Sequence, residues 1–124
     1  KQPQTTTVDN SLVIHLNQPR QRIRNFGASD AWTCQFVGNW PEAKRQQVAD
    51  WLFSTETDAN GQPKGIGLSC WRFNIGAGSM AQNAISDEWR QTEGFLKDDL
   101  TYDWSRQAGQ RWFMQAAKER GVDQ

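Results

Sequence analysis

The stretch Gly67–Ser79, GLSCWRFNIGAGS, is the feature that most limits what this chain can fold into. It predicts a strand with two unlike faces, made by alternate residues: Trp71, Phe73 and Ile75 on one, and Leu68, Cys70, Arg72 and Asn74 on the other. The first face is bulky and apolar, as expected under helices. The second turns polar toward its carboxyl end, which is typical of a barrel strand that opens into an active site. Because a buried arginine is costly without an anion, we expect a carboxylate or ligand near Arg72.

Two further β-rich runs precede this strand, at Ser11–Leu16 and Ile23–Gly27. The irregular segment Ser79–Asp103 follows it, and a loop of that length is usually functional. Val122 is placed to begin another strand. Strands that alternate with helices indicate βα units on a parallel sheet. Two units cannot cover both faces of such a sheet, so we expect the N-terminal piece of a larger β/α protein.

Two helices are predicted from their end signals. Asn39-Trp40-Pro41-Glu42 combines a capping side chain, a proline in the first turn and an acid at the positive end of the dipole, and this helix should end by about Ser54. The second helix should begin at a Ser105 cap and end at Gly121. The residues expected to be buried are Val48, Trp51 and Leu52 on the first helix, and Ala108, Trp112, Ala116 and Ala117 on the second.

Composition excludes several classes of function. Fourteen Lys and Arg balance fourteen Asp and Glu, which argues against nucleic acid or an anionic membrane as the main partner. Seven Trp and six Phe argue against a disordered chain, despite a mean hydropathy of −0.83. No apolar run approaches the roughly 20 residues that span a bilayer. Cys34 and Cys70 make neither a disulfide framework nor a zinc pattern, so we expect free thiols, no metal and no cofactor.

Two segments of the chain resemble the opening of glycoside hydrolase family 30, most closely its endo-β-1,6-galactanase-like branch. They are Asn25–Trp32, NFGASDAW, and Gly65–Ser79, GIGLSCWRFNIGAGS, and the resemblance covers roughly residues 8 to 124. It implies part of a retaining β-glycanase that hydrolyses O-glycosidic bonds of a β-linked polysaccharide or oligosaccharide, of the β-1,6-galactan kind. We therefore expect a secreted or periplasmic protein, although the chain carries no signal peptide. Its oligomeric state stays open.

The resemblance also implies a fold, a (β/α)8 TIM barrel with an attached side β-sandwich. Residues 1–20 would then hold a strand of the sandwich, Ser11–Leu16, and residues 21–124 the first two βα units of a truncated catalytic barrel. The family's two catalytic glutamates follow the fourth and seventh barrel strands. Both are therefore expected beyond residue 124, and the chain alone is expected to be inactive.

The same resemblance implies which residues support the sugar site. Arg72 matches the arginine of the second strand, which approaches the nucleophilic carboxylate and can hold it ionised and oriented. Asp30 and Trp32 match the region that lines a sugar subsite, where a carboxylate accepts paired hydroxyl groups and an indole faces the C–H side of a pyranose. Asn74 lies one step beyond Arg72 on the same face. These four residues are the predicted site, with no catalytic residue among them.

Each of the four residues also admits a purely structural interpretation. Arg72 could form a structural ion pair, and Asp30 could accept a turn hydrogen bond. Trp32 could fill the mouth of the barrel, and Asn74 could form hydrogen bonds with backbone groups of the loop. Each of these roles would leave the side chain buried or engaged without any contact to a sugar.

Other features of the sequence admit other functions. Trp89 and Trp104 could form outer sugar platforms, although core packing is the favoured interpretation. Gly76–Ala81 fits a dinucleotide fingerprint, but no helix is predicted to open at its glycines, which disfavours nucleotide binding. The chain could also be a non-catalytic carbohydrate-binding module, which would need exposed tryptophans, or a catalytically dead relative.

Overall fold

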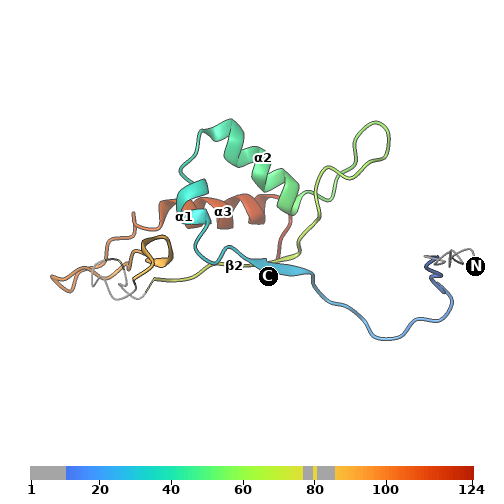
Figure 1. The fold of residues 1–124 in the computed structure, drawn as a ribbon, viewed down its shortest axis with the longest axis horizontal. Coiled ribbons are helices and arrows are strands. Elements are labelled where there is room, and N and C mark those ends of the chain that lie inside the picture. Colours follow the sequence, from blue (N-terminus) through green and yellow to red (C-terminus); the bar gives the residue numbers. More distant parts are fainter. Residues whose placement is uncertain (1–10, 77–79, 81–85) are drawn as a thin grey trace, which may run out of the picture.

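A computed structural model describes residues 11–76, 80 and 86–124. Its elements in chain order are β1 (Gly27–Ser29), α1 (Cys34–Val37), α2 (Glu42–Phe53), β2 (Cys70–Arg72), the 3-10 helix η1 (Glu88–Arg90) and α3 (Ala108–Glu119). β1 and β2 pair in parallel, with Gly27 opposite Cys70 and Ser29 opposite Arg72. Figure 1 shows α2 and α3 stacked on one side of this small sheet. The predicted α/β class is therefore confirmed, as a two-stranded parallel sheet with helices.

The first predicted helix is confirmed as α2, with two differences in detail. Pro41 precedes its first residue, whereas the Asn39 side chain donates to the Gln35 carbonyl at 2.7 Å and so completes the end of α1. The buried residues of α2 are Ala49 and Phe53, and the prediction that Trp51 is buried is wrong, because this indole is 54% exposed. The buried stripe is rotated by one residue from the expected one, since it faces both α3 and β2.

The second predicted helix is confirmed as α3, but it begins at Ala108 and not after a Ser105 cap. The Ser105 hydroxyl donates to Asp103 at 2.5 Å instead. The predicted end is confirmed: Gly121 has φ +86°, and its N–H donates to the Lys118 carbonyl at 3.1 Å, as in a Schellman motif. The buried residues of α3 are Gly109, Gln110, Phe113, Ala116 and Ala117. Ala108 is exposed and Trp112 only half-buried, which corrects the predicted stripe.

The core lies between the helices and the sheet. Its buried apolar side chains are Cys34, Ala49, Phe53, Leu68, Phe113, Ala116 and Ala117. Trp71 of β2 points to this side, as predicted, and meets Phe53 edge to face with ring centroids 5.0 Å apart. α1 and α3 approach so closely that a Cβ on Gly38 would lie 2.2 Å from the Gly109 carbonyl oxygen. Only glycine therefore fits at this contact.

The strands are shorter than the sequence predicts. β1 begins where the predicted run Ile23–Gly27 ends, and β2 covers three residues of the Gly67–Ser79 stretch. Ile75, expected in the apolar face, is 65% exposed because the chain has left the strand by then. The run Ser11–Leu16 forms no strand, and its apolar side chains are exposed. A strand needs a neighbouring strand to pair its backbone groups, and within the described residues neither the β1–β2 sheet nor any isolated β-bridge includes this run.

The other edge of β2 is not empty. The Trp71 N–H points away from β1 and donates to the Gln124 carbonyl at 2.7 Å. No strand begins at Val122 within the described residues, but this hydrogen bond places the end of the described chain along β2. Among the same residues no helix is long and apolar enough to cross a membrane.

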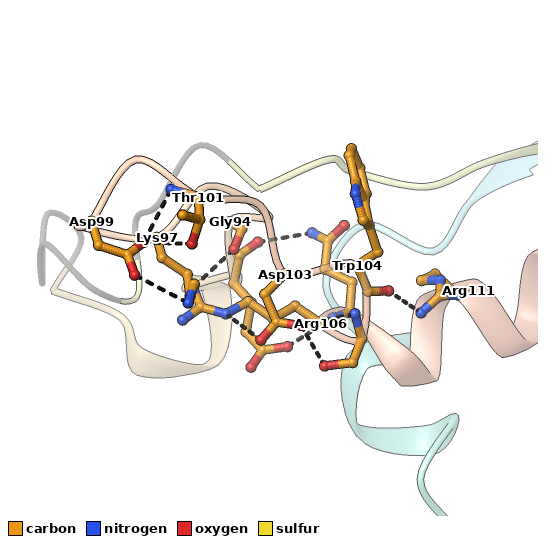
Figure 2. A network of polar contacts seen from close by, with 11 residues as sticks. Gly94, Lys97, Asp99, Thr101, Asp103, Trp104, Arg106 and Arg111 are labelled. Carbon is orange, nitrogen blue, oxygen red and sulfur yellow. Dashed lines mark hydrogen bonds and ion pairs between the residues drawn. The ribbon is translucent and has the colours of Figure 1, made fainter.

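The predicted irregular segment has internal order in the part that the structure describes. It contains η1, a parallel bridge between Gly76 and Gly94, and an antiparallel bridge between Leu96 and Tyr102. Figure 2 shows its polar network, in which Asp99 accepts from the Thr101 hydroxyl at 2.6 Å. Most of the Gly76–Ala81 fingerprint lies outside the described residues, and so does the prediction that rests on it.

Candidate functional site

The carboxyl ends of β1 and β2 lie at the same edge of the sheet because the strands are parallel. Asp30 follows β1 directly, and its N–H donates to the carbonyl of Arg72, the last residue of β2, at 3.0 Å. The segment that contains η1 extends beyond the same edge (Figure 1). The structure thus brings Asp30, Arg72 and Asn74 together, as the sequence predicts.

Asp30 is the most unusual residue of this edge. It is only 4% exposed, and neither of its carboxylate oxygens has a hydrogen-bond partner among the described residues. Burial raises the pKa of Asp30 to about 6, against the lowering effects of the Asn74 backbone N–H, the Arg72 charge and the Gln110 side chain. Asn74 and Gln110 face the carboxylate without reaching hydrogen-bond geometry. Asp30 therefore changes ionisation just below neutral pH and has acceptor capacity to spare.

Arg72 is exposed, contrary to the prediction of a buried guanidinium. The reason is that the helices cover only one face of the sheet, and Arg72 points to the other. Its Nη1 donates to the Ser29 hydroxyl at 3.3 Å, and it makes no ion pair with any residue that the structure describes. Most of its donors are therefore available to an anionic or hydroxylated group.

Trp32, the fourth predicted residue, lies in an aromatic cluster. Its ring meets that of Trp89 edge to face at 5.5 Å, and the Arg90 guanidinium lies 4.7 Å from its centroid. The Gln35 side chain donates to the Trp89 carbonyl at 3.1 Å, which ties η1 to α1. Trp32 is half-buried in this cluster, and no contact joins it to Asp30 in the structure as described.

The favoured interpretation of Trp89 and Trp104 as core residues is wrong for the described chain. Trp104 is 64% exposed, and Trp89 is exposed as well. Trp104 stacks on Tyr102 with ring centroids 5.2 Å apart and planes at 6°. Both tryptophans belong to the segment between β2 and α3, which the buried faces of the helices do not cover.

Two buried glutamines at the start of α3 complete the edge, and sequence reasoning missed both. Gln107 and Gln110 are 2% and 1% exposed. Their side-chain amides donate to the Asn74 carbonyl, at 3.2 Å and 3.5 Å. The sequence does carry a signal for Gln110, because this residue falls three positions before Phe113 and so lies on the buried stripe of α3. A glutamine in an apolar stripe indicates a polar group to be satisfied beneath it.

Backbone strain flanks the same residues. Ala31, next to Asp30, has φ +50°, and Gln107 has φ +54°. Residues with a side chain rarely adopt this left-handed conformation, and they persist in it only where the surroundings hold them. The Ala31 N–H donates to the Ser29 hydroxyl at 3.1 Å, and the Gln107 N–H donates to Glu93 at 2.8 Å. Both contacts fix the backbone around the carboxyl edge.

Cys34 lies at the start of α1, next to Asp30. Both cysteines are free, as predicted. Burial, and then the Asp30 charge, raise the pKa of the Cys34 thiol to about 12, so it stays protonated at neutral pH and is a poor nucleophile or metal ligand. The described residues contain no cluster of three His, Cys, Asp or Glu that could hold a metal ion.

The arrangement suits recognition of a polar molecule with several hydroxyl groups. Asp30 supplies acceptors, Arg72 supplies donors, and exposed aromatic rings lie along the segment beyond the edge. Glu93 is engaged with the Gln107 backbone, so the edge offers no carboxylate pair of the kind that acid–base hydrolysis needs among the described residues.

Comparisons with known proteins agree with this chemistry. A solved structure described as a conserved exported protein from Bacteroides fragilis is 48% identical to the chain and superimposes with a TM-score of 0.79. The match covers 88% of this chain but only 23% of that protein. A comparison with curated proteins finds no match. The model of the family described as O-glycosyl hydrolase family 30 matches residues 9–124, nearly all of the sequence, and the chain therefore belongs to O-glycosyl hydrolase family 30.

Proposed function

We propose that this chain forms one wall of the sugar site in a retaining β-glycanase that cleaves a β-linked polysaccharide of the β-1,6-galactan kind. The observation that carries the proposal is Asp30, a buried carboxylate at the carboxyl edge of a parallel sheet for which the described part of the chain supplies no hydrogen-bond partner. An unpaired buried carboxylate is unfavourable, so a group that donates hydrogen bonds is expected to complete it. Neighbouring hydroxyl groups of a sugar are donors of this kind.

Each of the other predicted residues has a role in this proposal. Arg72, with its free donors, lies beside the nucleophilic carboxylate and keeps it ionised. Trp32 and Trp89 offer rings to the C–H face of a neighbouring sugar unit. Asn74 lines the site through its backbone N–H, which faces Asp30.

The proposal includes a larger fold. Residues 21–124 would be the first two βα units of a (β/α)8 barrel, and residues 1–20 would contribute a strand to a side β-sandwich. The parallel pairing of β1 and β2 and the hydrogen bond from Trp71 to Gln124 support a barrel that continues past β2. The exposed apolar run Ser11–Leu16 supports a strand that pairs elsewhere in the protein.

The reaction itself would use two glutamates outside residues 1–124. One protonates the leaving oxygen, and the other, about 5–5.5 Å away, forms the glycosyl-enzyme intermediate of a retaining enzyme. We also propose that the protein is secreted or periplasmic, since the similar solved structure is described as an exported protein. Its partner is the glycan, with no role proposed for nucleic acid or membrane.

The test is Asp30→Asn in the full-length enzyme, with Asp58→Asn in the exposed turn between α2 and β2 as the matched control. Loss of hydrogen bonds to a charged acceptor should lower kcat/KM on β-1,6-galactan by about tenfold to a hundredfold, and Asp58→Asn should leave it unchanged. A value of kcat/KM for Asp30→Asn within twofold of the parent enzyme would refute the proposed role. Comparable turnover of β-1,4-galactan would refute the proposed linkage only.

A second candidate function, carbohydrate binding without hydrolysis, is favoured by the exposed Trp89 and Trp104. It predicts that the full-length protein binds β-1,6-galactan and releases no reducing sugar. Release of reducing sugar that is lost on Asp30→Asn would exclude it.

A further inference from the structure

We propose that Gln110 and Gln107 are positioning residues that hold the backbone of Asn74 and leave the Asp30 carboxylate free for substrate. The inference rests on the proposed function of Asp30 in sugar binding. It assigns a role to two glutamines that would not touch the reacting atoms.

The Asn74 carbonyl is the point where the two glutamines meet. It accepts from Gln107 Nε2 at 3.2 Å and from Gln110 Nε2 at 3.5 Å. Asn74 lies two residues beyond the end of β2, where no neighbouring strand fixes the backbone. The two amides replace that missing partner, and they hold Asn74 where its N–H faces Asp30.

Gln107 also joins Asn74 to the segment beyond the sheet. Its Nε2 donates to the Glu93 carbonyl at 3.0 Å, and its backbone N–H donates to the Glu93 carboxylate at 2.8 Å. These contacts are made from a left-handed conformation, which the backbone of a glutamine rarely adopts. The turn before α3 is thus bent so that one side chain spans from Glu93 to Asn74.

The neutral amide of Gln110 suits a site that must keep a free carboxylate. A lysine or arginine at this position would pair with Asp30 and occupy its acceptors. An apolar residue would leave the Asn74 carbonyl with one donor fewer. The amide oxygens of both glutamines lack hydrogen-bond partners among the described residues, so the cluster contains more acceptors than donors. Such a cluster favours a ligand with several hydroxyl groups.

The position of Gln110 also bears on the ionisation of Asp30. The charged or titratable groups that face Asp30 are Arg72 from β2 and Cys34 from α1, while α3 presents the neutral Gln110. Gln110, Asn74 and Arg72 each lower the pKa of Asp30, which burial raises. Removing the Gln110 amide should therefore raise this pKa further, so that a higher pH is needed to ionise Asp30.

The test is Gln110→Met in the full-length enzyme, with Gln115→Met on the exposed side of α3 as the control. Gln110→Met should move the acidic limb of the kcat/KM profile to higher pH by about 0.5 to 1 unit, because the polar amide that faces the carboxylate and lowers its pKa is replaced by an apolar group. The largest loss should be near pH 6, with recovery by pH 8. Gln115→Met should leave the profile in place. A loss of equal size at every pH would show a structural role and overturn the inference.

Asp30→Asn separates this inference from the function on which it rests. In an Asp30→Asn background Gln110→Met should no longer shift the profile, since the titrating group is gone. If Asp30→Asn lowers kcat/KM but Gln110→Met leaves the profile unmoved, only the inference fails. If Asp30→Asn itself has no effect, both fail.

Gln107→Gly is the substitute variant if Gln110→Met lowers the Tm so far that the pH profile of kcat/KM is not measurable. Glycine adopts the left-handed conformation freely, so this variant removes the side-chain contacts without straining the turn. We expect kcat/KM to fall by about tenfold, the value of one or two hydrogen bonds. Unchanged kcat/KM would contradict a positioning role for Gln107.

Discussion

The helix-covered side of the sheet and its carboxyl edge differ in the contacts that their residues make. On the helix side Phe53, Trp71 and Phe113 belong to one apolar core, and the rings of Phe53 and Trp71 meet edge to face. The only buried polar side-chain atom without a partner that these three residues contribute, among the described residues, is the Trp71 indole nitrogen. At the carboxyl edge the Asp30 carboxylate has no hydrogen-bond partner among the described residues, and Gln107 is held in a left-handed conformation. The first region stabilises the fold, and the second reduces stability. Unfavourable features gathered in one place indicate a site that a ligand completes.

The largest effect should come from the stabilising region. Phe113→Ala removes a fully buried ring from the centre of α3, and should lower the free energy of unfolding by about 3–5 kcal/mol. Met114→Ala, at the exposed next position, should change it by less than about 1 kcal/mol. Urea unfolding followed by tryptophan fluorescence measures both. Equal effects of the two variants would mean that α3 is not packed as described.

The carboxyl edge should respond in the opposite direction. Because the pKa of Asp30 is raised from 3.8 to about 6, its contribution to stability is greatest below pH 4 and is lost as the pH rises through 6. Asp30→Asn removes this loss, and should raise the free energy of unfolding at pH 7 by up to about 3 kcal/mol. The same variant should lower kcat/KM.

Urea unfolding of the parent protein and of Asp30→Asn at pH 4 and pH 7 shows whether the substitution raises or lowers the free energy of unfolding. The gain should be present at pH 7 and nearly absent at pH 4. Destabilisation at pH 7 would show that Asp30 supports the fold, and the contrast between the two regions would disappear.

An intermediate effect is expected where α1 meets α3. A Cβ on Gly109 would lie 2.4 Å from the Cys34 carbonyl oxygen, so Gly109→Ala must push the helices apart. We expect a loss of about 1–3 kcal/mol in the free energy of unfolding. Gln115→Ala on the exposed side of α3 should be close to neutral. A neutral Gly109→Ala would show that this contact has room to spare.

The smallest effect concerns the two thiols. At pH 8 a thiol reagent should modify the half-buried Cys70 before Cys34, because the raised pKa of Cys34 keeps it protonated. Asp30→Asn should leave Cys34 slow, since burial is the larger cause of that pKa. Mass spectrometry of the labelled peptides distinguishes the two sites. Faster labelling of Cys34 would place it at the surface.

How far the sequence predicts the fold depends on whether a signal is local. The helix ends at Glu42 and Gly121 follow from proline, an acidic first turn and glycine, which act within one turn. The buried stripes were predicted only in part: Ala116 and Ala117 are buried as expected, whereas Trp51 is exposed, because burial depends on which neighbours α2 and α3 meet. Ser11–Leu16 has the composition of a strand, but pairing is a property of two segments, and the described chain supplies only one.

The residues of the candidate site also differ in whether local sequence signals or packing neighbours determine them. Arg72 and Asn74 were singled out by strand alternation, whereas Asp30 and Trp32 followed only from the resemblance to family 30. The structure places Asp30 beside Arg72 and Asn74, and Trp32 in a separate aromatic cluster. Gln110 was missed although it falls on the buried stripe of α3, whereas Gln107 could not be found, because a glutamine before a helix is usually solvated and only the packing against Asn74 buries it. The exposure of Arg72 could not be predicted, since it depends on which face of the sheet is covered.

The polar network of Figure 2 has a consequence for how residues 95–105 can vary. Asp99 binds Thr101 and Asp103 binds Ser105, so this loop is held largely by its own side chains. At its base Arg106 donates to the Gly94 carbonyl, and Arg111 of α3 donates to the Trp104 carbonyl. A loop that is held by its own side chains and anchored at its base can be replaced without disturbing the rest of the fold. We expect that replacing residues 95–105 with a loop of equal span retains the Tm and alters which glycans are bound, so that new specificities arise without rebuilding the scaffold.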